Sequence, residues 1–178
     1  MPTDTKYPLI WRLLHWLIAL LVLVLIPAGL WMTSPGIDDA WNIYGAHKVV
    51  GFTVLWLMVL RLVIRLRTGP PPYPLSMPKL LATAARALHS VLYVLLFIIP
   101  LLGWAGVTAY PALITVAGLN LPAMPFIPQN KDLSEQLFAI HGTLALVLGV
   151  FIIGHIGAAL KHLLLNRDGI FQRMWFGK

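Results

Sequence analysis

The segment HGTLALVLGVFIIGH, which runs from His141 to His155, is an apolar stretch with a histidine at each end. In lipid an unpaired imidazole is costly, so both histidines are expected to be paired or functional. A separation of fourteen residues turns an α-helix through about 1400°, about 40° short of four full turns. The two side chains therefore share one helix face, about 21 Å apart along its axis. A single metal ion cannot bind both of them, whereas two stacked cofactors can.

The composition of the whole chain indicates that lipid is its solvent. The chain has 178 residues, of which 59% are hydrophobic and 11% charged, whereas a soluble domain carries roughly 25% charged residues. Its mean hydropathy is +0.82. There is no cysteine, which excludes disulfides, thiolate metal sites, iron–sulfur clusters and covalent haem attachment through C-x-x-C-H.

Four apolar stretches reach the length of about 20 residues that a membrane helix needs. They are Leu13–Trp31, Trp41–Leu60, Leu88–Tyr110 and Leu137–Leu160. The first has no A-x-A-like cleavage site and is too long for the core of a signal peptide, so we expect it to be retained. We predict an all-α membrane protein, a four-transmembrane-helix bundle in a single domain spanning residues 1–178. The expected helices cover about residues 9–33, 41–66, 80–110 and 133–165.

The placement of basic residues predicts the orientation of these helices. The net charge is +7, and such an excess in an apolar chain marks cytoplasmic segments rather than nucleic-acid binding. With the N-terminus inside, 11 of the 13 basic residues fall on the inner side. The outer side holds two basic and four acidic residues, which are Lys48, Lys131, Asp38, Asp39, Asp132 and Glu135. Both termini are therefore predicted to be cytoplasmic.

The segment 111–128, between the third and fourth predicted helices, is apolar but cannot span the membrane. It is broken by Pro111, Pro122, Pro125 and Pro128. Irregular backbone at membrane depth must be covered by protein. We therefore expect this segment to lie across the outer surface and to shield what is beneath it.

Six histidines lie within or at the edges of the four predicted helices: His15, His47, His89, His141, His155 and His162. The first helix enters from the inner side, so His15 lies in the inner half of the membrane. The second enters from the outer side, so His47 lies in the outer half. These depths match those of His155 and His141, respectively. The sequence thus predicts two stacked bis-histidine sites, His15 with His155 and His47 with His141.

Two histidines at each level favour haem over a bare metal ion. Zinc usually takes four protein ligands, or three and a water, whereas a haem iron needs only axial ligands from the protein. Without C-x-x-C-H the haem is non-covalent, so we expect two haem b, with the four paired histidines as axial ligands of the haem iron. Hydrogen bonding between helices is one alternative. A proton relay is another, although it would ordinarily recruit acidic residues, and the four apolar stretches contain none.

The remaining histidines, His89 and His162, are predicted to lie near the inner surface. Each is a candidate to replace a ligand, to hydrogen-bond a haem propionate or to help bind a quinone. The alternative is that both are ordinary interfacial polar residues. Arg12 and Lys161 lie at similar depth and are further candidates for propionate or quinone contacts.

At these residues the chain resembles the prokaryotic cytochrome b561 family, which is similar to the cytochrome b subunits of nickel–iron hydrogenases and formate dehydrogenases. The matching features are His15 in RLLHW, His47 in GAHKVVG, the pair His141 and His155, and the closing RDGIFQRM. The resemblance implies a four-helix dihaem cytochrome b in the bacterial inner (plasma) membrane that exchanges electrons with quinone. It also implies that the four matching histidines are the haem ligands. One class in the family is superoxide oxidase, which passes electrons from outer-side superoxide to ubiquinone.

We therefore expect transmembrane electron transfer through two b-type haems, linked to ubiquinone or another quinone and to a periplasmic donor or acceptor. Superoxide is one candidate donor, although the net charge of −2 on the outer segments does not favour an anion. The alternatives are a membrane cytochrome subunit of a larger dehydrogenase or hydrogenase, and a haem-free transporter or proton channel. The expected partners are lipid and quinone, without nucleic acid. We expect the quinone at the inner end, near His162 and His89, rather than at Lys48 on the outer end.

Overall fold

The computed structural model describes residues 6–36, 40–72 and 77–177, and it contains four long helices. They are α1 (Leu9–Met32), α2 (Ala40–Thr68), α3 (Lys79–Ala109) and α4 (Lys131–Lys161). All four are long and apolar enough to cross a membrane, and no strand occurs in the described ranges. The prediction of an all-α, four-helix membrane protein is confirmed. Asp38, Asp39 and Lys178, which entered the charge argument above, lie outside the described residues.

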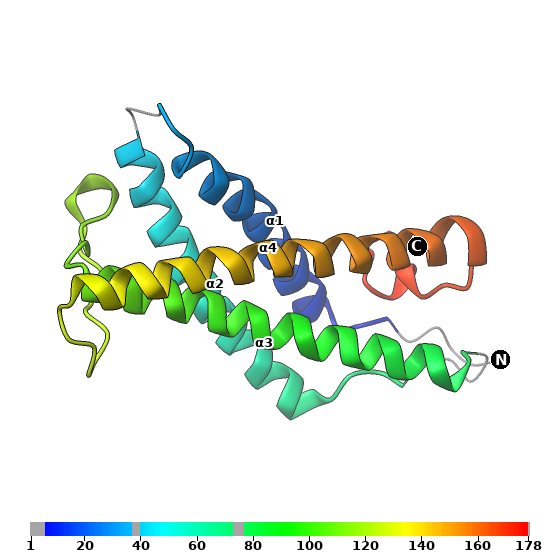
Figure 1. Cartoon of the computed structure of the whole chain (residues 1–178). Helices are drawn as coiled ribbons and strands as arrows, with labels where there is room; N and C mark the ends of the chain where they lie inside the picture. The colour runs from blue at the N-terminus through cyan, green and yellow to red at the C-terminus, as the bar shows by residue number, and fades with distance from the viewer. Residues whose placement is uncertain (1–5, 37–39, 73–76, 178) are drawn as a thin grey trace.

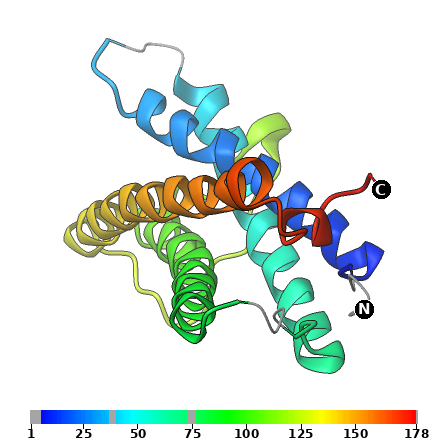
Figure 2. The same cartoon turned by 90° about the vertical axis from the view of Figure 1, so that its right-hand side faces the viewer.

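The helices form two hairpins that cross each other (Figure 1, Figure 2). One consists of α1 and α2, and the other of α3 and α4, which run side by side over much of their length. Contacts between α2 and α3, and between α1 and α4, join the two hairpins. Each helix therefore turns one face toward the crossing, and large apolar side chains on the outward faces remain exposed, as expected where lipid is the solvent.

The buried core lies between the two levels of histidines along the helices. It contains Ile18, Val22, Val54, Met58, Leu92, Leu95, Ile99 and Leu148. Leu148 stands seven residues from both His141 and His155, and seven residues bring a helix back to nearly the same face. Val54 has the same spacing from His47. One helix face thus supplies both the histidines and the apolar layer that separates the two levels.

Helix α4 has defined signals at both ends. It begins after Asn130, whose side chain accepts a hydrogen bond from the Leu133 amide at 2.9 Å, as an N-cap does. After Lys161 the helix widens into a π-helical turn, η2 (His162–Asn166). The turn ends at Arg167, which has a left-handed φ of 49°. The chain then reverses into the short 3-10 helix η3 (Phe171–Arg173).

The segment 111–128 lies across one end of the helices, as expected for a cover. Lys48 donates to the backbone carbonyls of Ala112, at 2.9 Å, and of Ile114. A Cβ atom on Gly45 would meet the Val116 backbone nitrogen at 2.8 Å, so only glycine allows this approach. Trp104 Nε1 donates to the Pro122 carbonyl at 2.7 Å. This end is called the outer end below, and the opposite end the inner end.

The two ends of the described chain meet at the inner end of the molecule. The Tyr7 amide donates to the Arg173 carbonyl at 3.0 Å, and Trp16 Nε1 donates to the Met174 carbonyl at 2.9 Å. Figure 1 shows the two ends of the described chain on the same side of the bundle. The termini thus lie at a common end, and their cytoplasmic location stays a prediction.

Candidate functional site

At the outer level, α2 and α4 bring His47 and His141 together. Their ring centroids are 6.1 Å apart and their planes meet at 71°. His141 Nδ1 lies 2.8 Å from the Ile99 carbonyl of α3. A carbonyl only accepts, so Nδ1 donates and Nε2 keeps its lone pair. Metal-binding histidines typically donate their other ring N–H to a backbone carbonyl or carboxylate in this way.

At the inner level, α1 and α4 bring His15 and His155 together. Their ring centroids are 6.2 Å apart, with an interplanar angle of 89°. His89 of α3 joins the same cluster, with its ring 5.4 Å from that of His155 and a hydrogen bond to the Ala85 backbone. The structure therefore pairs the histidines that the sequence matched in depth, and it adds His89 to the inner pair.

Arg61 of α2 completes the inner cluster, and the sequence reasoning did not single it out. Its Nη1 lies 3.1 Å from His15 Nδ1, and its Nε donates to the Tyr93 hydroxyl at 3.0 Å. Arg65 also lies against Tyr93, with its Cζ 4.9 Å from the ring centroid. Arginine stays charged in proteins, so the inner level carries a permanent positive charge.

A spacing of fourteen residues between chemically notable positions recurs on all four helices. This spacing is the sequence signal by which Arg61 could have been identified. The pairs are His15 with Gly29, His47 with Arg61, His89 with Gly103, and His141 with His155. The outer level consists of two histidines and two glycines, and the inner level of three histidines and one arginine. A Cβ on Gly29 would meet His47 Cε1 at 3.3 Å, and a Cβ on Gly103 would meet His141 Cε1 at 3.0 Å. The two glycines therefore make room for the outer imidazoles.

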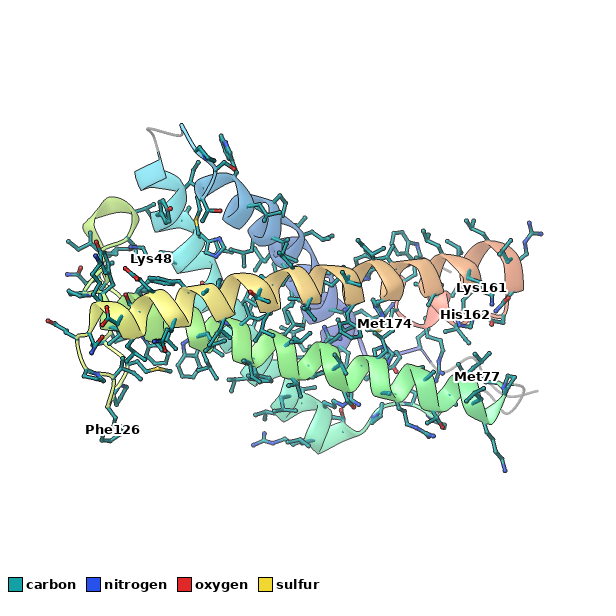
Figure 3. The ribbon with its side chains drawn as sticks, in the orientation of Figure 1. Lys48, Met77, Phe126, Lys161, His162 and Met174 are labelled. Carbon is teal, nitrogen blue, oxygen red and sulfur yellow. The ribbon has the colours of Figure 1, made fainter. Side chains whose placement is uncertain are left out.

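His162 does not join the inner cluster but pairs with Asp168 beyond the end of α4. Its Nδ1 lies 2.6 Å from Asp168 Oδ2, and Figure 3 shows His162 at the same end of the molecule as Met77. Burial alone would raise the pKa of Asp168. Hydrogen bonds from His162, the Ile170 amide and Asn166 outweigh this effect and hold the pKa of the carboxyl below its ordinary value.

Arg12 and Lys161, the other predicted inner contacts, have different surroundings. Arg12 Nη1 donates to the Trp175 carbonyl at 2.9 Å, and its guanidinium lies over the Phe176 ring. The Nε atom of Arg12 is buried without a hydrogen-bond partner. Lys161 is exposed at the end of α4 (Figure 3). Arg12 is thus engaged by the C-terminal turn, and Lys161 is open at the inner surface.

The donor set fits a cofactor that brings most of its own ligands. Among the described residues, no group of three or more histidine, cysteine, aspartate or glutamate side chains is arranged to hold a metal ion unaided. The outer level instead offers one pair of imidazoles from different helices, and the inner level offers such a pair with His89 beside it. Beside these pairs, a Cβ on Gly51, Gly142, Gly154 or Gly157 would have no neighbour within 4 Å. A flat apolar macrocycle can lie against helix backbone at such positions, so the residues present fit haem.

Comparisons with known proteins agree with this geometry. The profile of the family described as prokaryotic cytochrome b561 matches residues 6–177. The chain belongs to the prokaryotic cytochrome b561 family. It is 33% identical to cytochrome b561 homolog 2 of Escherichia coli K12 over 176 residues, which cover 97% of this chain and 92% of the relative. It is 31% identical to a probable superoxide oxidase CybB of Yersinia pestis, over 95% of each chain. Cytochrome b561 homolog 1 of E. coli K12 is 31% identical over 72% of each chain.

Family membership confirms several expectations at the level of the whole protein. This cytochrome b561 family member is a multi-pass protein of the bacterial inner membrane. It transfers electrons across that membrane, and the family implies haem b as its cofactor. The family resemblance drawn from the histidine pattern is likewise confirmed.

Proposed function

We propose that this cytochrome b561 family member holds two haems b, one between His47 and His141 and one between His15 and His155. The observation that carries the proposal is the spacing of the two pairs. An imidazole nitrogen binds a transition metal at about 2 Å, and the ring centre lies about 1 Å beyond that nitrogen. Two axial imidazoles on one iron therefore have centroids about 6 Å apart. The measured separations are 6.1 Å and 6.2 Å.

The same reasoning favours His15 over His89 as the inner partner of His155. The ring centroids of His89 and His155 are 5.4 Å apart, which is shorter than two axial ligands on one iron require. It is an ordinary packing distance between two aromatic rings. His89 then stands beside the inner pair, where its imidazole is available to the edge of the inner haem or to a quinone.

Haem b, when bound, supplies reversible one-electron chemistry at each level. With two histidines on each iron, no coordination position would be open to substrate, and small molecules would react at the haem edges. The protein holds the two imidazole pairs about 21 Å apart along α4. The apolar core around Leu148 keeps water out of the space between them. We propose that electrons enter from a donor at the outer end and leave to a quinone at the inner end.

Superoxide is one candidate for the electron donor at the outer end. The relative from Yersinia pestis is called a probable superoxide oxidase, which makes superoxide the first donor to test. The position of Lys48 does not favour an anionic donor, because its ammonium already donates hydrogen bonds to the backbone carbonyls of Ala112 and Ile114. If superoxide is the donor, stopped-flow mixing of the purified oxidised protein with superoxide should give the absorption spectrum of the reduced haems. Unchanged spectra would require another outer-side reductant.

Haem content and single-ligand variants test the two sites. Pyridine haemochrome quantification of the purified protein should give two haems b per chain, and the absorption spectrum of the native protein should show that both are low-spin. His47→Ala or His141→Ala should remove one haem, and His15→Ala or His155→Ala the other. A single haem per chain would refute the paired sites. Loss of the inner haem in His89→Ala but not in His15→Ala would show that α3 supplies the ligand.

The inner quinone site is tested by the double variant His89→Phe, His162→Phe. It should slow haem reoxidation by a soluble ubiquinone analogue while the absorption spectrum stays normal. If that rate is unchanged, and Lys48→Met or trimming of residues 111–128 abolishes it instead, the quinone binds at the outer end. Stoichiometric co-purification of a large redox enzyme would point instead to a cytochrome subunit of a larger complex.

A further inference from the structure

A tight turn at the outer end of the molecule holds the bulky apolar side chain of Phe126 away from the rest of the protein. The turn runs from Met124 to Ile127, and the Ile127 amide closes it by donating to the Met124 carbonyl at 3.4 Å. Phe126 is completely exposed, at 103%, and Figure 3 shows its side chain pointing away from the helices. It therefore packs against no part of the chain that the structure describes.

The backbone conformation of Phe126 is unusual for its residue type. Its φ is 65°, a left-handed conformation that bulky side chains rarely adopt. Pro125 precedes it, and proline followed by a residue with positive φ is the pattern of a type II turn, whose third position ordinarily takes glycine. Phenylalanine at this position gains no packing inside the protein that offsets the strain. We therefore expect its side chain to be stabilised by contacts outside the chain.

Hydrogen bonds on both sides of Phe126 fix the turn to the outer end of α3. The Met124 amide donates to Thr108 Oγ1 at 3.0 Å, and the Asn130 amide donates to the Ala109 carbonyl at 3.0 Å. Thr108 and Ala109 are themselves buried. Phe126 thus projects from a fixed place on the molecule.

Lipid is the surrounding that suits this side chain. The segment 111–128 contains no charged residue, and the helices that it connects are long and apolar enough to cross a membrane. Two further exposed aromatic residues, Trp31 and Tyr110, lie at the outer ends of α1 and α3. Aromatic side chains gather in this way where a membrane meets water. Phe126 continues this aromatic surface, and removing its ring from water is favourable.

We propose that Phe126 inserts into the lipid leaflet at the outer end and anchors the segment 111–128 to the membrane. The segment is then held at two places. On the side of α2, Lys48 donates hydrogen bonds to its backbone carbonyls, and at the turn Phe126 enters the lipid. This anchor acts on the position of the segment and requires neither of the proposed haem sites nor a quinone.

Site-directed spin labelling tests the insertion, because the chain has no cysteine and one introduced cysteine takes the label alone. Phe126→Cys carries a nitroxide in the haem-loaded, full-length protein in vesicles of phosphatidylethanolamine and phosphatidylglycerol. Collisions with oxygen, which concentrates in lipid, are compared with collisions with a water-soluble nickel chelate. The label at position 126 should favour oxygen, as should one on Val150→Cys, which is exposed on α4. A label on Ser34→Cys, which is exposed in the first outer connection, should favour the nickel chelate.

A label at Ala123, which is exposed in the same segment, tests the anchoring. In Ala123→Cys with Phe126 present, the nitroxide spectrum should report restricted motion. Adding Phe126→Asp should narrow the lines, because a carboxylate stays in water and releases the segment. Phe126→Leu, which remains apolar, should keep the line shape. Gln129→Asp adds the same charge at a nearby exposed position and, as the matched control, should also keep it.

Four results would overturn the proposal. Predominant collisions with the nickel chelate at position 126 would place the side chain in water, open to a soluble protein. Spin–spin broadening that disappears on dilution with unlabelled protein would show that a second copy of the chain covers Phe126. Equal line shapes at Ala123 with Phe126 and with Phe126→Asp would refute the anchoring. Loss of the haem spectrum in Phe126→Leu would show that the ring is needed inside the protein instead.

Discussion

At the scale of single residues, the proposed outer haem site depends on a glycine that no ligand motif would identify. A Cβ on Gly103 would lie 3.0 Å from Cε1 and 3.1 Å from Nδ1 of His141. It would therefore press the ring away from the Ile99 carbonyl that orients it. We expect Gly103→Ala to lower outer-haem occupancy, or to broaden and shift the outer-haem band, and to leave the inner haem unchanged.

The control for this substitution is Gly149→Ala. Gly149 lies on α4 eight residues after His141, and a Cβ there would meet nothing within 4 Å. Low-temperature difference spectra with pyridine haemochrome quantification resolve the two haems. Equal spectra for Gly103→Ala and wild type would mean that the outer imidazole does not need this space.

Arg61 places a fixed charge at the inner level that has no counterpart at the outer level. Its guanidinium contacts His15 and Tyr93, and a nearby cation favours the reduced, more negative state of a haem. We expect Arg61→Gln to lower the midpoint potential of the inner haem by about 50–100 mV. A unit charge about 8 Å away gives a shift of this order at an effective dielectric constant of about 20.

Redox titration followed optically measures this shift. The variant Arg61→Lys, which keeps the charge, should keep the midpoint potential of the inner haem close to that of the wild type. The outer haem, about 21 Å away along α4, should move much less. A shift confined to the outer haem, or none at all, would contradict the placement of a haem between His15 and His155.

At the scale of helices, α3 and α4 pack closely because Gly106 has no side chain. A Cβ on Gly106 would lie 2.6 Å from Cε1 of Phe138, well inside van der Waals contact. We expect Gly106→Ala to destabilise the protein by about 1–3 kcal/mol, the usual cost of overpacking. The double variant Gly106→Ala, Phe138→Leu should recover part of that loss. Thermal unfolding in detergent, followed by haem absorbance, gives both values, and additive effects of the two substitutions would exclude direct contact.

The long helices were predictable because their signal extends over the whole length of each element. Four apolar stretches, interrupted by prolines and charges, predicted the four membrane helices, and the histidine spacing predicted which rings meet. The π-helical turn at His162 was not predictable, because it accompanies a contact between Asp168 and an imidazole six residues earlier. The meeting of His89 with His155 was also not predictable, since sequence depth alone does not show which helix faces which.

Arg61 shows a different limit of sequence reasoning. The fourteen-residue spacing from His47 was visible in the sequence, but arginine near a helix end is ordinarily a topology signal. Only the contacts with His15 and Tyr93 show that this side chain turns inward. In a membrane helix, the face on which a basic residue lies therefore decides whether its charge sets the orientation of the helix or acts on the functional site.

At the scale of the whole molecule, the orientation of the bundle in the membrane determines which end of the proposed electron path faces the cytoplasm. Tyr7 and Arg173 join the two ends of the chain by a backbone hydrogen bond, so one orientation decides both termini. In the topology predicted from the sequence, 11 of the 13 basic residues fall on the side of the termini, and such an excess is retained in the cytoplasm. We expect a C-terminal green fluorescent protein fusion to fluoresce and a C-terminal alkaline phosphatase fusion to be inactive. Fusions after Thr33, in the first outer connection, should give the reverse result. Active phosphatase at the C-terminus would invert the bundle and place the inner level of histidines on the periplasmic side.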